Sequence, residues 1–275
     1  MKESAEIQEL LDAPQLALLP APPPGVGADE PVCLALPDSP AAEAVRRLAD
    51  VLDPVLGRAA STVLVTSAVA GEGKSTTVAN LGVELARTGR RVALADLDLR
   101  RPALHRFFGL WRSPGAPEAA ALPAERLWSA LVPIDLGLGG SAPTRRPWAR
   151  RPPVPGTGAL LVLPAGGPVD DPAARLADPA LGALLGRLGR ELDVVLVDSP
   201  PVLSVPDALA LSPLLQAAIV VSGVGTSTRG ELADAAARLD TVGSRPLGYV
   251  VTERRSRRSS RQRDDDYYAW DEPAA

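Results

Sequence analysis

Residues 62–77 read TVLVTSAVAGEGKSTT and are the most informative stretch of this chain. The β-branched run at 62–66 predicts a buried strand, and a helix is expected over about 74–88, with Gly89 ending it. Between them, residues 68–75 (AVAGEGKS) fit the P-loop pattern, with alanine in the first glycine position. A strand, a glycine-bearing loop and a helix in this order predict a phosphate-binding site where the helix begins.

The loop carries groups suited to a nucleoside triphosphate. Its glycines let backbone N–H groups turn inward around a phosphate, Lys74 can reach the β- and γ-phosphates, and the Ser75 hydroxyl can ligate Mg²⁺. Of the 29 basic residues only Lys2 and Lys74 are lysines, which indicates that position 74 needs a flexible point charge. The simple alternative is a glycine turn that only caps a helix. The residues expected to bind the nucleotide are Gly71, Glu72, Gly73, Lys74, Ser75 and Thr76.

Aspartates follow two further apolar runs. Asp96 and Asp98 come after a strand predicted at 92–95, and alternation places both on one side, facing the phosphates or the metal. One could ligate Mg²⁺ and the other accept a proton, and the plain alternative is a solvated acidic turn. Asp198 ends the run at 194–197 as in a Walker B motif, and is expected to hold Mg²⁺ through a water. The predicted catalytic residues are Lys74, Asp96, Asp98 and Asp198, and the predicted metal ligands are Ser75, Asp98 and Asp198.

Strands and helices alternate along much of the chain. The strands are apolar throughout, which indicates burial on both faces. The pattern predicts an α/β fold of the P-loop NTPase type, with a doubly wound, mostly parallel sheet and helices on both faces in a single domain. Further strands are expected at 160–163, 218–221 and 247–251, and helices at 41–57, 173–190, 206–215 and 228–242.

Three segments depart from this alternation. Residues 1–40, with PAPPP at 20–24, are expected to form a flexible Pro-rich leader before the P-loop domain at 41–252. Residues 112–158 are rich in proline and arginine and are expected to be a long surface insertion. Residues 253–275 are expected to form a disordered tail that carries a tyrosine pair.

Composition excludes several classes of protein. The chain has 275 residues, 46% of them apolar and 23% charged, which excludes global disorder. The net charge of −4 argues against a nucleic-acid-coating protein. Cys33 is the only cysteine, so no disulfide can form within the chain, as suits a reducing cytosol. The most apolar stretch, 194–224, is broken by aspartates and prolines and is not expected to span a bilayer.

Taken together, the motifs resemble the bacterial tyrosine kinases (BY-kinases), cytoplasmic P-loop kinases of capsule and exopolysaccharide synthesis. Residues 71–77 (GEGKSTT) resemble the family's Walker A motif, and 96–102 (DLDLRRP), with His105 and Phe108 after it, resemble its Walker A′ block. The wider superfamily includes partition ATPases, which carry a signature lysine where Val69 stands here, so the resemblance favours the kinase branch. Two shorter matches are 163–166 (LPAG) and 198–201 (DSPP) with Asp207 and Ala208 after it.

The resemblance implies an ATP- and Mg²⁺-dependent autokinase whose C-terminal tyrosines enter the active site of a neighbouring subunit. The expected phosphoacceptors are Tyr267 and Tyr268. The family's oligomerisation motif, Glu-x-x-Arg-x-x-Arg, is incomplete here: Glu43 and Arg46 fit, but Ala49 replaces the second arginine. Thr252 and Glu253 stand where the family often has an asparagine near the adenine, and His105 is expected to pack near the rim while an aspartate acts as base.

Partners and location also follow from the resemblance. It implies self-assembly and docking on a membrane-spanning activator at the inner face of the cell membrane. No nucleic-acid partner is expected, because the net charge is −4. Two other functions stay open. One is a P-loop ATPase switch that dimerises on ATP and positions a partner without phosphotransfer. The other is a nucleotide-binding scaffold of polysaccharide assembly.

Overall fold

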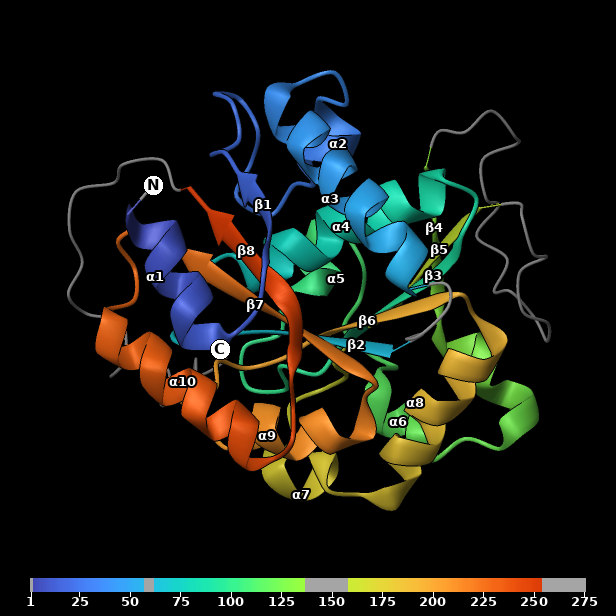
Figure 1. Ribbon diagram of the computed structural model, residues 1–275. Coiled ribbons are helices and arrows are strands. Elements are labelled where there is room, and N and C mark those ends of the chain that lie inside the picture. The colour runs from blue at the N-terminus through green and yellow to red at the C-terminus, as the bar shows by residue number, and fades with distance from the viewer. Residues whose placement is uncertain (1, 57–61, 137–157, 254–275) are drawn as a thin grey trace, which may run out of the picture.

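The computed structural model describes residues 2–56, 62–136 and 158–253, built around one eight-stranded sheet (Figure 1). The strands are β1 (Gln15–Leu19), β2 (Thr62–Ser67), β3 (Arg91–Asp96), β4 (Val132–Ile134), β5 (Ala159–Leu163), β6 (Val194–Asp198), β7 (Ala217–Gly223) and β8 (Pro246–Thr252). Their order is β1-β8-β7-β2-β6-β3-β5-β4, and only the pairing of β4 with β5 is antiparallel. The prediction of a doubly wound, mostly parallel sheet is confirmed.

Helices cover both faces of this sheet. The longer ones are α1 (Lys2–Leu11), α3 (Pro40–Leu56), α4 (Lys74–Arg87), α8 (Pro179–Glu191) and α10 (Arg229–Thr241). Successive strand residues point to opposite faces: Val63 and Val65 of β2 lie in the core that includes α3 and α4, and Leu64 lies in the core that includes α8. The shorter ones are α2 (Val32–Ala35), α5 (Leu104–Phe107), α6 (Ala116–Ala120), α7 (Pro172–Leu176), α9 (Asp207–Leu211) and the 3₁₀ helices η1 (Ala124–Ala130) and η2 (Ser212–Leu214).

The N-terminal segment is part of the fold, so the expectation of a flexible leader over 1–40 is wrong for the residues described. Strand β1 adds to the sheet beside β8, with Leu18 opposite Val251, and α1 packs against α10 and β8. Cys33 is fully buried, and its N–H donates to Asn80 Oδ1 at 3.0 Å. Strand β8 offers the backbone hydrogen-bond partners that this short segment cannot find within itself. An edge strand of a sheet presents such unpaired groups.

Two other expectations need correction. The first half of the expected insertion at 112–158 is folded: it contains α6, η1 and β4, and buries Leu127 and Trp128 in the core beside α8. The second half, 137–157, lies outside the described residues. The helix expected at 173–190 is divided into α7 and α8 at Asp178, which accepts a hydrogen bond from the Ala180 N–H as the N-cap of α8. The helix expected at 206–215 likewise becomes α9 followed by η2.

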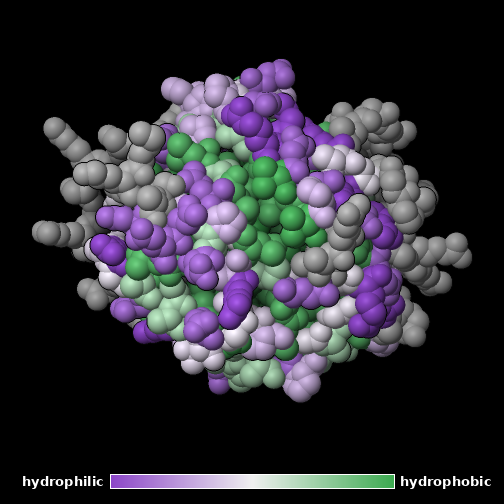
Figure 2. All heavy atoms as spheres, viewed as in Figure 1, coloured by the Kyte–Doolittle hydropathy of each residue, from purple (hydrophilic) through white to green (hydrophobic). Residues whose placement is uncertain are grey.

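The surface carries some apolar area. Figure 2 shows apolar side chains gathered near the middle of the face seen in Figure 1, within a mostly hydrophilic border. Helix α3 contributes two exposed valines, Val51 and Val55, one turn apart. In the part of the chain that the structure describes, no helix combines the length and apolar character needed to cross a membrane.

Candidate nucleotide and phosphotransfer site

The phosphate loop follows β2, the strand between β7 and β6, and leads directly into α4. Gly71 and Gly73 have φ angles of 79° and 91°, in the left-handed region that favours glycine. Lys74 is the first residue of α4, and its side chain is largely buried. Ser75 is half-buried and Thr76 is exposed. The predicted strand–loop–helix arrangement is therefore present, and it presents the start of a helix, where anions bind readily.

Glu72 was expected to contact the nucleotide, but its side chain points into the protein. It is fully buried, and Oε1 accepts hydrogen bonds from the Gly223 N–H at 3.1 Å and the Ser227 hydroxyl at 2.8 Å. Oε2 accepts from the Val69 N–H at 3.0 Å. Burial raises the pKa of Glu72, and these hydrogen bonds oppose that rise. The carboxylate thus fastens the phosphate loop to the segment that follows β7.

Thr252 fastens the same loop from the end of β8. Its hydroxyl donates to the backbone carbonyl of Glu72 at 2.8 Å. A Cβ at Gly73 would lie 3.4 Å from the Thr252 side chain, so the two chains are in close contact. No local sequence pattern connects Gly223, Ser227 and Thr252 with this loop, because they lie more than 140 residues away along the chain.

Asp96 and Asp198 lie opposite each other at the ends of two adjacent parallel strands, β3 and β6. Both side chains are fully buried. Asp96 Oδ2 accepts from the backbone N–H groups of Ala103 and Leu104, each at 2.9 Å, while Oδ1 has no hydrogen-bond partner among the described residues. Burial raises the pKa of Asp96 well above its usual value, and the charges of Asp198 and Asp98 raise it further. The ionised form of this carboxylate is therefore an able proton acceptor.

Asp198 is the least satisfied carboxylate of the site. Neither of its oxygens has a hydrogen-bond partner in the described part of the chain. Burial raises its pKa to about 7, the Lys74 ammonium and the Ser75 hydroxyl oppose that rise, and Asp98 adds to it. A buried carboxylate without partners, next to a lysine and a hydroxyl, fits a cation that brings its own charge.

Asp98 completes the acidic set predicted from the sequence. Its side chain is largely buried, and Oδ1 accepts from the Arg101 N–H at 2.9 Å. Within the described ranges, no three His, Cys, Asp or Glu side chains are grouped closely enough to hold a metal by themselves. Mg²⁺ commonly takes only one or two carboxylates and completes its shell with phosphate and water, so the donor set matches a nucleotide-bound Mg²⁺.

The loop after β3 is held by an ion pair that sequence reasoning missed. Arg100 Nε donates to Asp207 Oδ2 at 2.9 Å and Nη2 to Oδ1 at 3.4 Å, and the Asp207 carboxylate is fully buried. This pair joins the Asp96–Asp98 loop to the start of α9. His105 lies nearby on α5, half-buried, and its pKa is lowered by burial and by the charges of Arg112 and Arg106.

Other predicted residues lie outside the site or outside the described chain. Glu43 and Arg46 pair on α3, and Arg46 also lies 3.5 Å from the buried Glu84. Ala49 is buried, so this position of α3 faces the protein interior. The predicted phosphoacceptors, Tyr267 and Tyr268, fall beyond residue 253, outside the described residues.

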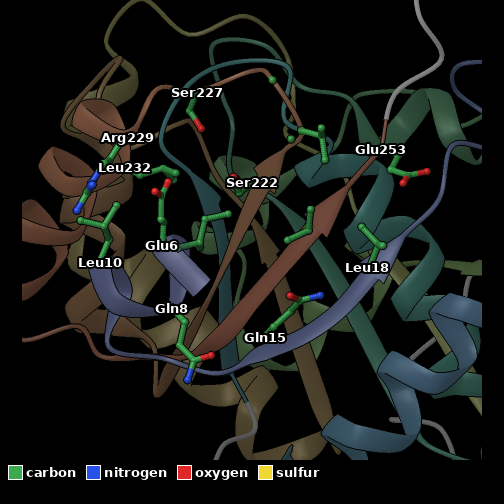
Figure 3. A pocket seen from close by; sticks show the side chains of 15 residues that line it. Glu6, Gln8, Leu10, Gln15, Leu18, Ser222, Ser227, Arg229, Leu232 and Glu253 are labelled. Atoms are coloured by element: carbon green, nitrogen blue, oxygen red, sulfur yellow. The ribbon is translucent and has the colours of Figure 1, made fainter. Parts of the chain in front are cut away.

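A cavity of about 730 Å³ lies beside the phosphate loop (Figure 3). It is lined by α1, β1, the ends of β7 and β8, and the start of α10. Gly223 and Ser227 belong both to its wall and to the hydrogen bonds that hold Glu72, so cavity and loop are directly connected. Leu18 and Leu232 line it with apolar surface, and Glu253 lies at its edge (Figure 3).

Comparison with known proteins agrees with this geometry. A family model described as the CobQ/CobB/MinD/ParA nucleotide binding domain matches residues 63–269. The solved BceF tyrosine kinase domain is 30% identical, with a TM-score of 0.72 over 90% of this chain and 97% of that chain. This chain belongs to the MinD/ParA-type nucleotide-binding family, in its bacterial tyrosine-kinase branch. The resemblance inferred from the motifs is confirmed.

Two relatives differ in the share of their own length that this chain covers. The tyrosine-protein kinase YwqD of Bacillus subtilis is 28% identical over 211 residues, which are 77% of this chain and 78% of YwqD. The putative tyrosine-protein kinase EpsB of Ralstonia solanacearum is 32% identical over 198 residues, which are 72% of this chain but 24% of EpsB. The chain therefore spans about a quarter of the length of EpsB.

Proposed function

We propose that this chain is an ATP-dependent protein-tyrosine autokinase. The observation that carries the proposal is the pair Asp96 and Asp198. They are buried side by side next to the phosphate-loop Lys74, with oxygens that have no hydrogen-bond partner among the described residues. Phosphoryl transfer depends mainly on positioning and on neutralising phosphate charge, and this edge of the sheet offers groups for both. The names of the relatives, tyrosine-protein kinases in both cases, support a tyrosine as acceptor.

In this proposal the phosphate loop binds ATP, with Lys74 on the β- and γ-phosphates and the cavity beside β8 receiving the nucleoside. Ser75, Asp98 and Asp198 would hold Mg²⁺, which would neutralise charge on the phosphates when bound. Glu72 acts only through the loop, because its side chain faces the interior.

Asp96 is the proposed general base. Its pKa is raised and its Oδ1 has no hydrogen-bond partner among the described residues, whereas we assign Asp98 to Mg²⁺. The tyrosine oxygen forms a bond to the γ-phosphorus, the bond from that phosphorus to the β–γ bridging oxygen breaks, and ADP leaves. The phenolic proton passes to Asp96. The backbone N–H groups of Ala103 and Leu104 fix the orientation of this carboxylate.

The proposed acceptors are Tyr267 and Tyr268 of a neighbouring subunit, so the active assembly is a homo-oligomer. We further propose that the chain works at the inner face of the cell membrane, beside a membrane-spanning polysaccharide co-polymerase, and regulates capsule or exopolysaccharide synthesis. A related protein carries the name succinoglycan biosynthesis transport protein ExoP, which supports the link to polysaccharide export.

A mixing experiment tests the proposal. A Lys74→Met chain, which keeps its tyrosines, is combined with a Tyr267→Phe/Tyr268→Phe chain, which keeps its phosphate loop, in the presence of Mg-ATP. Phosphotyrosine on the Lys74→Met chain is expected in the mixture and in neither chain alone. ATP hydrolysis without phosphotyrosine in any sample would contradict the kinase and favour the ATPase switch. Absence of both nucleotide hydrolysis and phosphotyrosine would favour the scaffold.

A further inference from the structure

The segment between α5 and α6 exposes a tryptophan at the active edge of the sheet. Trp111 is 90% exposed, the largest value among the exposed large apolar side chains of the described residues. Hydrogen bonds hold the backbone of the residues immediately before and after Trp111. The Leu110 N–H donates to the His105 carbonyl at 2.8 Å, and the Arg112 carbonyl accepts from the Gly166 N–H at 3.0 Å. An aromatic ring held in water by an anchored backbone is suited to contact another molecule.

These anchors connect the Trp111 segment to the ends of β3 and β5, the edge of the sheet that carries Asp96. On one side, α5 begins at the N–H groups that donate to Asp96. On the other side, Gly166 follows β5, and β5 pairs with β3 in parallel, with Leu163 opposite Ala95. Neighbouring strands lie about 4.8 Å apart, so the ends of β5 and β3 are adjacent. The nucleoside cavity lies toward β8, at the opposite end of the same sheet edge.

Two basic side chains belong to the segment that carries this tryptophan. Arg106 is exposed and Arg112, the residue after Trp111, is half-buried. Arg112 and Arg106 both lie close enough to His105 to lower its pKa, so the two arginines share one positive region. Asp29 offsets part of that charge through a pair with Arg106 at 3.4 Å, between two side chains that are about half exposed. We call Trp111 with Arg106 and Arg112 the Trp111 platform.

We propose that the Trp111 platform docks residues 264–272 (DDDYYAWDE) of a second copy of this chain and so presents their tyrosines to the active site. This inference rests on the proposed function and adds to it the surface that selects the acceptor. The segment carries five acidic residues and no basic one, which complements the arginines. Its two tyrosines and Trp270 supply aromatic rings for stacking against Trp111.

A binding experiment with the full-length chain tests the platform without relying on catalysis. The probe is a fluorescein-labelled peptide of residues 262–275 with phenylalanine at both tyrosine positions, titrated in the presence of Mg-ADP. Trp111→Ala is expected to raise its Kd at least about fivefold, and Trp111→Phe to change it less than about twofold. Leu214→Ala is the matched control, because Leu214 is also exposed but lies beside the opposite edge, where the Gln216 N–H donates to the Thr62 carbonyl.

The outcomes separate this inference from the kinase proposal. Parental peptide affinity in Trp111→Ala, or no binding of the peptide to any form, would overturn the platform. Equal binding of a peptide with asparagine in place of every aspartate would overturn the charge complementarity. With the tyrosine-containing peptide as substrate, Trp111→Ala is expected to raise KM and to leave kcat and the KM for ATP unchanged. An unchanged KM for the peptide with normal turnover would overturn the platform and support the kinase proposal. Trp111-dependent binding without phosphorylation would support the platform and contradict the kinase proposal.

Discussion

Replacing Asp198 by asparagine is expected to abolish Mg²⁺-dependent turnover and, at high pH, to stabilise the nucleotide-free fold. The Asp198 carboxyl is fully buried, and burial raises its pKa to about 7 from 3.8. Because the folded-state pKa lies above the unfolded value, the stabilising contribution of this group is complete below pH 3.8 and is lost as the pH rises through about 7. The ionised carboxylate then costs the folded chain about 4 kcal/mol at pH 8.

Asparagine removes that cost but adds an amide N–H₂ with no acceptor in place, at about 1–3 kcal/mol. At pH 5 the folded carboxyl is almost entirely neutral, so its remaining cost is only about 2 kcal/mol and nearly cancels the amide penalty. At pH 8 the variant should exceed the parent in free energy of unfolding by about 1–3 kcal/mol. The difference between variant and parent should therefore grow by about 3 kcal/mol from pH 5 to pH 8.

Urea unfolding at pH 5, 6.5 and 8, without nucleotide, measures this difference. Asp193→Asn is the control of opposite sign. Hydrogen bonds from Arg91 lower the pKa of Asp193, so its contribution is present above its ordinary pKa and is lost in acid. That variant should be less stable than the parent at pH 8. A loss of stability in Asp198→Asn of equal size at pH 5 and pH 8 would show that ionisation of buried Asp198 does not destabilise the fold.

Further predictions concern the phosphate loop. Lys74→Arg keeps the charge but brings bulk and a planar fork, so Mg-ATP affinity measured by titration should fall at least about tenfold, with the circular dichroism spectrum retained. Glu72→Gln leaves one amide N–H₂ facing a backbone N–H, so urea unfolding should show a loss of about 2 kcal/mol. Thr252→Val removes the hydrogen bond from the hydroxyl to the Glu72 carbonyl. It should lower the free energy of unfolding by about 1 kcal/mol and also lower the affinity for nucleotide. Full stability in Glu72→Gln or Thr252→Val would show that these contacts do not hold the loop.

The order of strands and helices around the phosphate loop could be predicted because its signals are local. The run at 62–66, the glycines after it and Lys74 are neighbours in sequence, and each has a fixed meaning for strand, turn or helix. The same holds for Asp96 and Asp198, which end apolar strands whose parallel pairing brings them together. Parallel pairing of adjacent strands was therefore enough to predict that these carboxylates share one edge of the sheet.

What the sequence could not supply is the set of contacts made across long separations. Glu72 belongs to the phosphate loop by position, but its side chain is drawn inward by Gly223 and Ser227, which no local pattern connects with it. Strand β1 was hidden for a similar reason. Its five residues gain a ladder only from the edge of β8, and the proline run that follows gave the whole segment the composition of a flexible leader.

A single time course shows whether this site transfers phosphate to tyrosine. Purified full-length chain is incubated with Mg-ATP, phosphate release and protein-bound phosphate are measured together, and the modified residues are mapped by mass spectrometry. Phosphate is expected on Tyr267 and Tyr268 of the parent chain, and neither tyrosine is expected to be phosphorylated in the Asp198→Asn variant. Phosphate release that proceeds with every tyrosine unmodified would contradict it.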